Sequence, residues 1–116
     1  MRIKTTILFS LIASLGLAST GFAAEAADGQ ALAFDRKKGN CLACHAIPSE
    51  PKAESPGNIG PPLVKMKLRF PDRAALRARI WDETAFNPDT VMPPFGRNKI
   101  LTEAEIDLVT DYIQGL

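Results

Sequence analysis

The chain has 116 residues, of which 14 are basic and 13 acidic, so its formal net charge is +1. This length is enough for one domain, and a charge so close to zero excludes the strongly basic surface that is typical of nucleic-acid-binding domains. The two cysteines are only three positions apart, which is too close in sequence for a disulfide bond that joins distant elements.

The first residues have the composition of an export signal. Arg2 and Lys4 form a basic start, and residues 7–17 are an apolar run broken only by small residues. A membrane anchor is the alternative, but an uninterrupted span needs about 20 apolar residues and this run is roughly half as long. We therefore expect a signal peptide that is removed on export.

The predicted cleavage site follows Ala23, with Ala26 as the second choice. Residues 1–23 then form the signal peptide and residues 24–116 the mature domain, which has no membrane span and is expected in the periplasm. The mature domain keeps 12 basic and 13 acidic residues, a net charge of −1. Its 93 residues bury a smaller fraction of their surface than those of a larger domain, so a large buried cofactor would add to the core.

The mature domain shows helical punctuation and no useful alternating strand pattern, which predicts an all-α fold. The first helix is expected to begin near Asp28, whose carboxylate can cap free N–H groups, and to end at Gly39. Between residues 46 and 62, prolines and glycines exclude a continuous helix and predict an ordered loop. A short helical turn is expected at residues 62–68.

Two further helices are expected in the second half of the chain. Asp72 can cap the first of them, and a loop at residues 87–96 follows it. Thr102 and Glu105 have the spacing of a capping box, in which each side chain binds the backbone N–H of the other residue. The last helix is therefore expected to begin after Thr102, which brings the domain to three or four helices.

The segment Cys-Leu-Ala-Cys-His at residues 41–45 joins two thiols at a fixed separation to an imidazole. This is the attachment pattern of haem c, in which Cys41 and Cys44 form thioether bonds to the porphyrin vinyl groups and His45 lies against the iron. A thioredoxin-like redox pair would need a βαβ context. A structural zinc site would need four ligands, and the chain has no further cysteine or histidine. We therefore expect one covalently attached haem c.

The second axial ligand of the iron is expected to be a methionine. His45 is the only histidine in the chain, which excludes a second histidine ligand. Met66 stands between two lysines in the expected helical turn, whereas Met92 stands in the expected loop with prolines on both sides. Because a stiff loop can pre-position a weakly binding thioether, we predict His45 and Met92 as the iron ligands. The alternative is that Met92 only packs against its neighbours.

The segment Gly-Pro-Pro-Leu at residues 60–63 has two interpretations. An axial histidine normally donates its free ring N–H to an acceptor that fixes its tautomer, and a proline carbonyl can serve as that acceptor. The segment can equally form a plain turn. The spacing is compatible with both.

The chain is poorly equipped for catalysis on its own. Once both cysteines are thioethers and His45 binds iron, neither a thiol nucleophile nor a free histidine base remains. We assign no catalytic residue. An iron with both axial positions filled by the protein changes oxidation state without binding a substrate, which predicts electron transfer.

Four stretches of this sequence together resemble class I cytochromes c, and their exact residues resemble the SoxX family in particular. They are Gly-Asn-Cys-Leu-Ala-Cys-His, Asn-Ile-Gly-Pro-Pro-Leu, Asn-Pro-Asp-Thr-Val-Met-Pro-Pro-Phe-Gly and Leu-Thr-Glu-Ala-Glu-Ile. The resemblance spans nearly the whole mature chain. It implies a class I cytochrome c-like fold around one haem, with Cys41 and Cys44 as attachment sites and His45 and Met92 as axial ligands.

The resemblance also implies a function. SoxX is the small cytochrome subunit of the periplasmic SoxAX complex, an L-cysteine S-thiosulfotransferase that oxidatively joins thiosulfate to a cysteine of the carrier SoxYZ during sulfur oxidation. In that family the catalytic site belongs to SoxA, and the small subunit passes the released electrons on one at a time. The implied partners are SoxA in a heterodimer, SoxYZ transiently, and a downstream electron acceptor.

Two other functions and one detail of packing stay open. A free monohaem electron shuttle is the first alternative, and a gas-binding haem protein with Met92 off the iron is the second. Phe34 stands further before Cys41 than the corresponding aromatic residue of common class I cytochromes c. Its packing against Tyr112 of the last helix is therefore not settled by the resemblance.

Charge is unevenly distributed along the chain. Residues 65–79 contain six basic residues and one acid, whereas residues 101–116 contain four acids and no basic residue. We consider the hypothesis that this basic segment orients the domain on SoxA or on an electron acceptor, with Arg73 and Arg77 as the residues to reverse in a test, because complementary charge raises association rates. The alternative is a pair of solvated helix faces.

Overall fold

The computed structural model describes residues 21–116, and the secondary structure of this part is entirely helical. The elements are α1 (Gly21–Phe34), η1 (Cys41–Ala43), α2 (Met66–Arg69), α3 (Arg73–Trp81), η2 (Glu83–Ala85) and α4 (Glu103–Gln114). The prediction of an all-α fold is thereby confirmed. Within the described part, no helix is both long and apolar enough to span a membrane. The basic start and apolar run of the predicted signal peptide lie outside the described residues.

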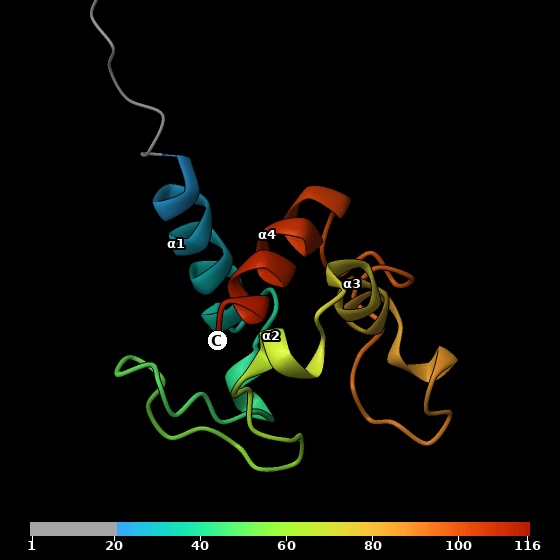
Figure 1. The fold of residues 1–116 in the computed structure, drawn as a ribbon. Helices are drawn as coiled ribbons and strands as arrows, with labels where there is room; N and C mark the ends of the chain where they lie inside the picture. Colours follow the sequence, from blue (N-terminus) through green and yellow to red (C-terminus); the bar gives the residue numbers. More distant parts are fainter. Residues whose placement is uncertain (1–20) are drawn as a thin grey trace, which may run out of the picture.

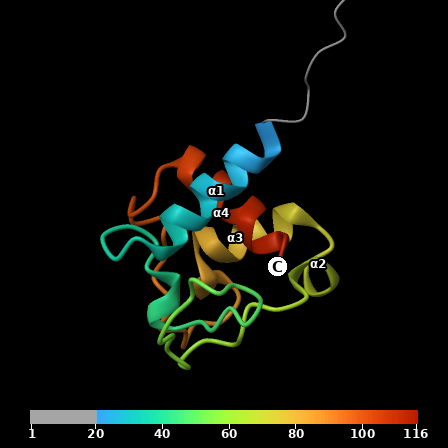
Figure 2. The ribbon, with the colours of Figure 1, turned by 90° about the vertical axis from the view of Figure 1, so that its left-hand side faces the viewer.

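Helix α4 is the centre of the fold. Figure 1 shows α1 along one side of α4 and α3 on the other, and Figure 2 shows α1 in front of α4. The apolar stripe of α4 is buried between them, with Ile106, Val109 and Ile113 at most 3% exposed. Leu76 and Ile80 of α3 complete this side of the core. Burial of these aliphatic side chains supplies most of the driving force for packing the three helices.

Helices α1 and α4 approach closely at Gly29. A Cβ atom on Gly29 would lie 2.7 Å from Cβ of Tyr112 and even closer to the carbonyl oxygen of Leu108, so only glycine fits there. One turn further along, the rings of Phe34 and Tyr112 meet edge to face, with centroids 6.2 Å apart and an interplanar angle of 79°. The packing of Phe34 against Tyr112, which the resemblance left open, is therefore present.

The bounds of the first helix differ from the prediction. Helix α1 includes Gly21 and ends at Phe34, whereas the sequence was expected to form a helix from Asp28 to Gly39. The residues before Asp28 are mostly alanine, the strongest helix former, so the helix continues through them. At the other end the chain turns back before Gly39, whose N–H donates to the carbonyl of Leu32 at 3.1 Å.

Two of the three predicted helix caps are present, whereas Asp28 lies inside α1 and does not begin it. Oδ1 of Asp72 accepts a hydrogen bond from the N–H of Ala74 at 2.9 Å at the start of α3. At the start of α4, Oγ1 of Thr102 accepts from the N–H of Glu105 at 3.2 Å, and the Glu105 carboxylate accepts from the N–H of Thr102 at 2.9 Å. The sequence therefore located the beginnings of these two helices correctly.

The remaining expectations about local structure are also confirmed. Residues 46–62 and 87–96 contain no helix or strand. The short helical turn expected at residues 62–68 corresponds to α2, which begins at Met66 and ends at Arg69, slightly further along the chain. Figure 1 shows the 46–62 segment in green and the 87–96 segment in orange, at opposite sides of the lower part of the molecule.

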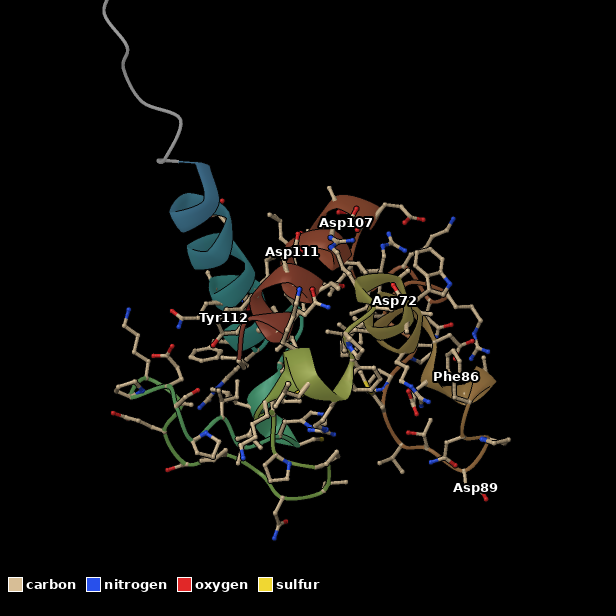
Figure 3. All side chains as sticks on the ribbon, in the orientation of Figure 1. Asp72, Phe86, Asp89, Asp107, Asp111 and Tyr112 are labelled. Carbon is tan, nitrogen blue, oxygen red and sulfur yellow. The ribbon has the colours of Figure 1, made fainter. Side chains whose placement is uncertain are left out.

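The basic residues of α3 pair with the acidic residues of α4. The guanidinium of Arg73 binds the carboxylates of Asp107 and Asp111, and that of Arg77 binds Asp107 at 2.7 Å and also Glu103. These hydrogen bonds raise the pKa of Arg77, with Asp107 the main cause, and the bond from Arg77 lowers the pKa of Asp107. Figure 3 shows Asp107 and Asp111 along α4. The two charged segments are thus joined inside the molecule.

This pairing changes the interpretation of the charge pattern. Arg73 and Arg77 are not the free cations of a docking surface, because carboxylates of α4 compensate their charges, while the ion pairs themselves stay partly exposed to solvent. The pairing therefore does not support Arg73 and Arg77 as docking residues, and the docking role of the basic segment stays a prediction. The role of the two arginines is to join α3 to α4.

Candidate functional site

The cysteine motif forms one tight helical turn, η1, directly after the turn that ends α1. Asn40 has the left-handed backbone conformation, with φ of 47°, and its carbonyl accepts from the N–H of Ala43 at 3.0 Å. The carbonyl of Cys41 then accepts from the N–H groups of Cys44 at 3.1 Å and His45 at 2.9 Å. This turn brings Cys41, Cys44 and His45 into one short unit, as attachment of a single haem requires.

The two thiols are free, half-buried and not joined to each other. Burial raises the pKa of the Cys41 thiol to about 11. Cys41 is therefore a neutral thiol at neutral pH, unlike the acidic thiolate of a disulfide-exchange site. This favours a structural or attachment role over thiol redox chemistry.

The imidazole of His45 has a defined hydrogen-bond partner. Its Nδ1 lies 2.7 Å from the carbonyl oxygen of Pro61. Because a carbonyl oxygen can only accept, Nδ1 is the donor, which in the neutral imidazole leaves the lone pair of Nε2 for a metal. Of the two interpretations of the 60–63 segment, the acceptor interpretation agrees with this geometry.

Gly60 supports the same ring from the side. A Cβ atom at this position would lie 2.6 Å from Nδ1 and 2.8 Å from Nε2 of His45, closer than real Cβ contacts occur. The N–H of Gly60 donates to the carbonyl of Cys44 at 2.8 Å, which holds the loop against the cysteine turn. Sequence reasoning singled out this segment for its carbonyl and missed the contact of Gly60 with the imidazole. A glycine directly before the two prolines was the available signal.

Arg69 of α2 is a second residue that sequence reasoning missed. Its Nη1 donates to the carbonyl of Pro62 at 2.9 Å and to the sulfur of Met66 at 3.3 Å. The side chain therefore joins α2 to the segment that contains the acceptor for His45. No local pattern predicts such a contact, because it depends on how the loop returns to α2.

The two candidate methionines have different surroundings. Met66 is 2% exposed, its sulfur accepts from Arg69, and its N–H donates to the carbonyl of Leu116 at 3.2 Å. Met92 is half-buried and packs against the edge of the core. Its N–H donates to Oγ1 of Thr90 at 3.1 Å, which shapes the loop around it. Met66 is thus a core residue, and Met92 is the methionine in a structured loop.

These residues fit a haem. Two free thiols stand next to an imidazole whose Nδ1 contacts the carbonyl of Pro61 and whose ring lies against Gly60, and together they form the donor set of a c-type attachment site. The segments that contain Pro61 and Met92 lie on opposite sides of the lower part of the molecule, as Figure 1 shows. In the view of Figure 2 the green segment that contains Pro61 lies in front, and the orange segment that contains Met92 lies behind.

Comparison with known proteins agrees with this chemistry. The family model described as cytochrome C oxidase, cbb3-type, subunit III matches residues 24–113. The chain belongs to this family of c-type cytochromes. Family membership implies haem c as the cofactor of this cytochrome.

The cytochrome is also similar to a chain in the crystal structure of SoxXA from P. pantotrophus. The TM-score is 0.69 and the sequence identity 27%, over 76% of this chain and 78% of that chain. The predicted cytochrome c-like fold is thereby confirmed, and the chain is a SoxX-like cytochrome. Fold and family together support an electron-transfer role.

A curated relative is an uncharacterized lipoprotein of Aquifex aeolicus (strain VF5). It is 35% identical over 77 residues, which are 66% of this chain and 36% of that protein. The cytochrome thus spans about a third of the length of this relative.

Proposed function

We propose that this cytochrome is the electron-transfer subunit of a SoxAX-type complex, which joins thiosulfate to a cysteine of a SoxYZ-type carrier. The observation that carries the proposal is the likeness to a chain of SoxXA, which extends over 76% of this chain. The four sequence stretches that resemble the SoxX family support it, because they lie at the cysteine turn, the histidine acceptor, the Met92 loop and the cap of α4.

In this proposal Cys41 and Cys44 attach one haem c, and His45 and Met92 are its axial ligands. When bound, the haem supplies a one-electron iron couple. The carbonyl of Pro61 accepts the hydrogen bond from Nδ1 of His45, which would leave Nε2 to hold the iron and would make the ring a more basic ligand. The thioether of Met92 would hold the iron as the second protein ligand, and such a ligand would favour the reduced iron relative to a second nitrogen ligand. With both positions filled, substrate is kept off the metal.

The electron balance of the reaction explains why such a subunit is needed. Joining a carrier thiolate to the terminal sulfur of thiosulfate forms one S–S bond and releases two electrons. One haem iron accepts one electron at a time, so the two electrons leave this subunit singly toward a one-electron acceptor. The S–S bond itself forms on the partner, since both cysteines of this chain are used for attachment.

The proposal includes a location and three partners. We place the mature domain in the periplasm after cleavage of residues 1–23, because c-type haem is attached outside the cytoplasm. There it forms a heterodimer with a SoxA-type cytochrome and contacts the carrier and the acceptor only transiently.

The deciding experiment is co-expression of this chain with a SoxA-type cytochrome under haem-maturation conditions. We expect the two proteins to co-purify in equal amounts and to elute as one heterodimer in size analysis. We also expect the haem of this chain to become reduced when thiosulfate and a carrier with a free thiol are both added. A carrier whose thiol has been alkylated is the control and should leave the haem oxidised.

Two other results would each reject the proposal in a different way. A monomer that exchanges electrons with small redox proteins but not with the SoxA-type cytochrome would identify a free shuttle. Rapid carbon monoxide binding by the reduced wild-type protein would identify an open iron site and a gas-binding function.

A further inference from the structure

The loop that contains Met92 ends in a close contact between a glycine and a tryptophan. A Cβ atom on Gly96 would lie 2.6 Å from Cζ3 of Trp81 and still closer to two other atoms of the ring. Real Cβ atoms essentially never come within 3.0 Å of another heavy atom in this way. Glycine is therefore the only residue type at position 96 that allows the loop to lie directly on the Trp81 ring.

Hydrogen bonds and an ion pair hold the same junction. The N–H of Gly96 donates to the carbonyl of Trp81 at 3.1 Å, so backbone and ring are both in contact. The neighbouring Arg97 binds the carboxylate of Asp82 at 2.9 Å and Oγ1 of Thr84 at 3.3 Å. The end of the loop is thus attached to the end of α3 and to η2 at several points.

The Trp81 ring is itself restrained. The guanidinium of Arg77 lies over this ring, 5.7 Å from its centroid, and the same guanidinium binds Asp107 of α4. Moving the ring away from Gly96 would disturb the contacts that join α3 to α4. An extra atom on Gly96 is therefore accommodated by displacing the loop.

The beginning of the loop is held as well. The N–H of Met92 donates to Oγ1 of Thr90, the N–H of Thr90 to the carbonyl of Asn87 at 3.1 Å, and the N–H of Asn87 to the carbonyl of Glu83 at 2.9 Å. Only four positions separate Met92 from Gly96, and two of the intervening residues are prolines that bend little. A displacement at Gly96 is therefore transmitted to Met92.

From these contacts we infer that Gly96 and Trp81 are positioning residues that set where the sulfur of Met92 lies. The inference rests on the proposed ligation of iron by Met92. Neither residue touches the iron or donates to it. Their contact determines how far the loop stands from α3, and hence whether the thioether reaches the metal without strain.

The test is Gly96→Ala in the mature holoprotein, with three readouts: the sulfur-to-iron absorption band at the red end of the ferric spectrum, carbon monoxide binding by the reduced form, and thermal unfolding. We expect the fraction of molecules with sulfur off the iron to rise about tenfold, which corresponds to about 1.4 kcal/mol and lies within the usual cost of overpacking. Gly115→Ala is the matched control, because an added Cβ there meets no atom closer than 3.3 Å. It should leave the band unchanged.

A second pair of variants distinguishes positioning from general destabilisation. In a Trp81→Leu background the ring is gone, so Gly96→Ala should no longer change carbon monoxide binding. If Gly96→Ala keeps the absorption band and only lowers the unfolding temperature, the inference is overturned. It is also overturned if Gly96→Ala changes carbon monoxide binding equally in the wild-type and Trp81→Leu backgrounds. If Gly96→Ala does not fold, Trp81→Leu alone decides, because a loosened loop should also raise carbon monoxide binding.

Met92→Ala separates this inference from the proposal beneath it. If Met92→Ala keeps the absorption band, the proposed ligation is wrong and the inference falls with it. If Met92→Ala loses the band while Gly96→Ala and Trp81→Leu keep it, the ligation stands and only the positioning role is rejected.

Discussion

At the scale of single residues, the chemistry of this cytochrome depends on a short turn and on one atom of a proline. The turn at Cys41–Ala43 places two thiols next to His45, and the carbonyl of Pro61 assigns the proton of the imidazole to Nδ1. The close contact of Gly60 with the ring leaves the imidazole little freedom to rotate. The nitrogen that would bind iron in the proposed site is thus oriented by contacts within the protein.

Covalent attachment is the first prediction at this scale. After expression with the c-type maturation machinery, the wild-type chain should keep its haem through denaturing electrophoresis and stain for it. The double variant Cys41→Ser/Cys44→Ser should lose the stain, because a hydroxyl does not add to a vinyl group as a thiol does. Haem that stays with the double variant after denaturation would contradict thioether attachment.

The second prediction at this scale concerns the identity of the distal iron ligand. Met92→Ala should abolish the sulfur-to-iron band and open a site for carbon monoxide, because the other methionine of the described residues, Met66, lies in α2 and in the core. Met66→Ala should keep the band but lower the free energy of unfolding by about 2–5 kcal/mol, because Met66 is buried in the core. Met66→Leu, which conserves volume, is the control and should change neither property much. The reverse pattern would assign the ligand to Met66.

At the scale of elements, α4 organises the molecule. One of its sides packs on α1 through Gly29 and Tyr112, and another binds α3 through the arginine and carboxylate pairs. The hydroxyl of Tyr112 is buried, and burial raises its pKa. Among the described residues, it has no hydrogen-bond partner. Figure 3 shows Tyr112 and Asp111 as neighbours along α4.

The cap of α4 leads to a prediction about pH. The bond from Lys38 at 2.7 Å, together with the bond from the N–H of Thr102, lowers the pKa of Glu105 below its ordinary value of 4.5. The unfolded chain therefore binds a proton at Glu105 more readily than the folded chain does. This part of the stability is complete above a pH of about 4.5 and is lost as the pH falls through the lowered pKa.

Thr102→Ala tests this prediction by urea unfolding across a pH series. It should cost about 1 kcal/mol at neutral pH, because Oγ1 no longer accepts from the N–H of Glu105. It should reduce the fall in stability on acidification only slightly, because the hydroxyl is the smallest cause of the lowered pKa of Glu105 and the N–H of residue 102 still binds the carboxylate. Thr102→Ser keeps the hydroxyl and should behave like the wild type. A loss in Thr102→Ala no larger than in Thr102→Ser would argue against the cap.

The pairing between α3 and α4 gives a further prediction. Arg77→Glu should lower the free energy of unfolding by about 1 kcal/mol or more, because it places like charges beside Asp107 where an ion pair existed. The exchange Arg77→Glu/Asp107→Arg should recover part of this loss. Full stability in the single variant would show that the pair contributes nothing, as many exposed pairs do.

At the scale of the whole molecule, the sequence predicts a domain that acts only after export. The mature protein isolated from the periplasm should begin at residue 24, since cleavage is predicted after Ala23, or at residue 27 if Ala26 is used. Intact mass after haem attachment measures this directly. A purified chain that retains Met1 and still contains covalent haem would contradict cleavage.

Much of the fold was accessible from the sequence because its signals are local. The caps Asp72 and Thr102, the helical periodicity and the proline-rich loops each depend on residues a few positions apart, and all appear in the structure as expected. The bounds of α1 were the exception. There an alanine-rich stretch extended the helix past Asp28, and the chain turned back before Gly39.

The sequence alone also predicts the attachment chemistry, since thiols and imidazole lie within five consecutive residues. Only the tertiary structure decided which atom accepts the hydrogen bond from Nδ1 of His45 and how the arginines of α3 pair with the carboxylates of α4. It also decided how Gly96 lies on the Trp81 ring. The physical reason is that these contacts join residues 15 to 30 or more positions apart. Their formation depends on how the loops return to the helices, and no local pattern of residue types encodes that path.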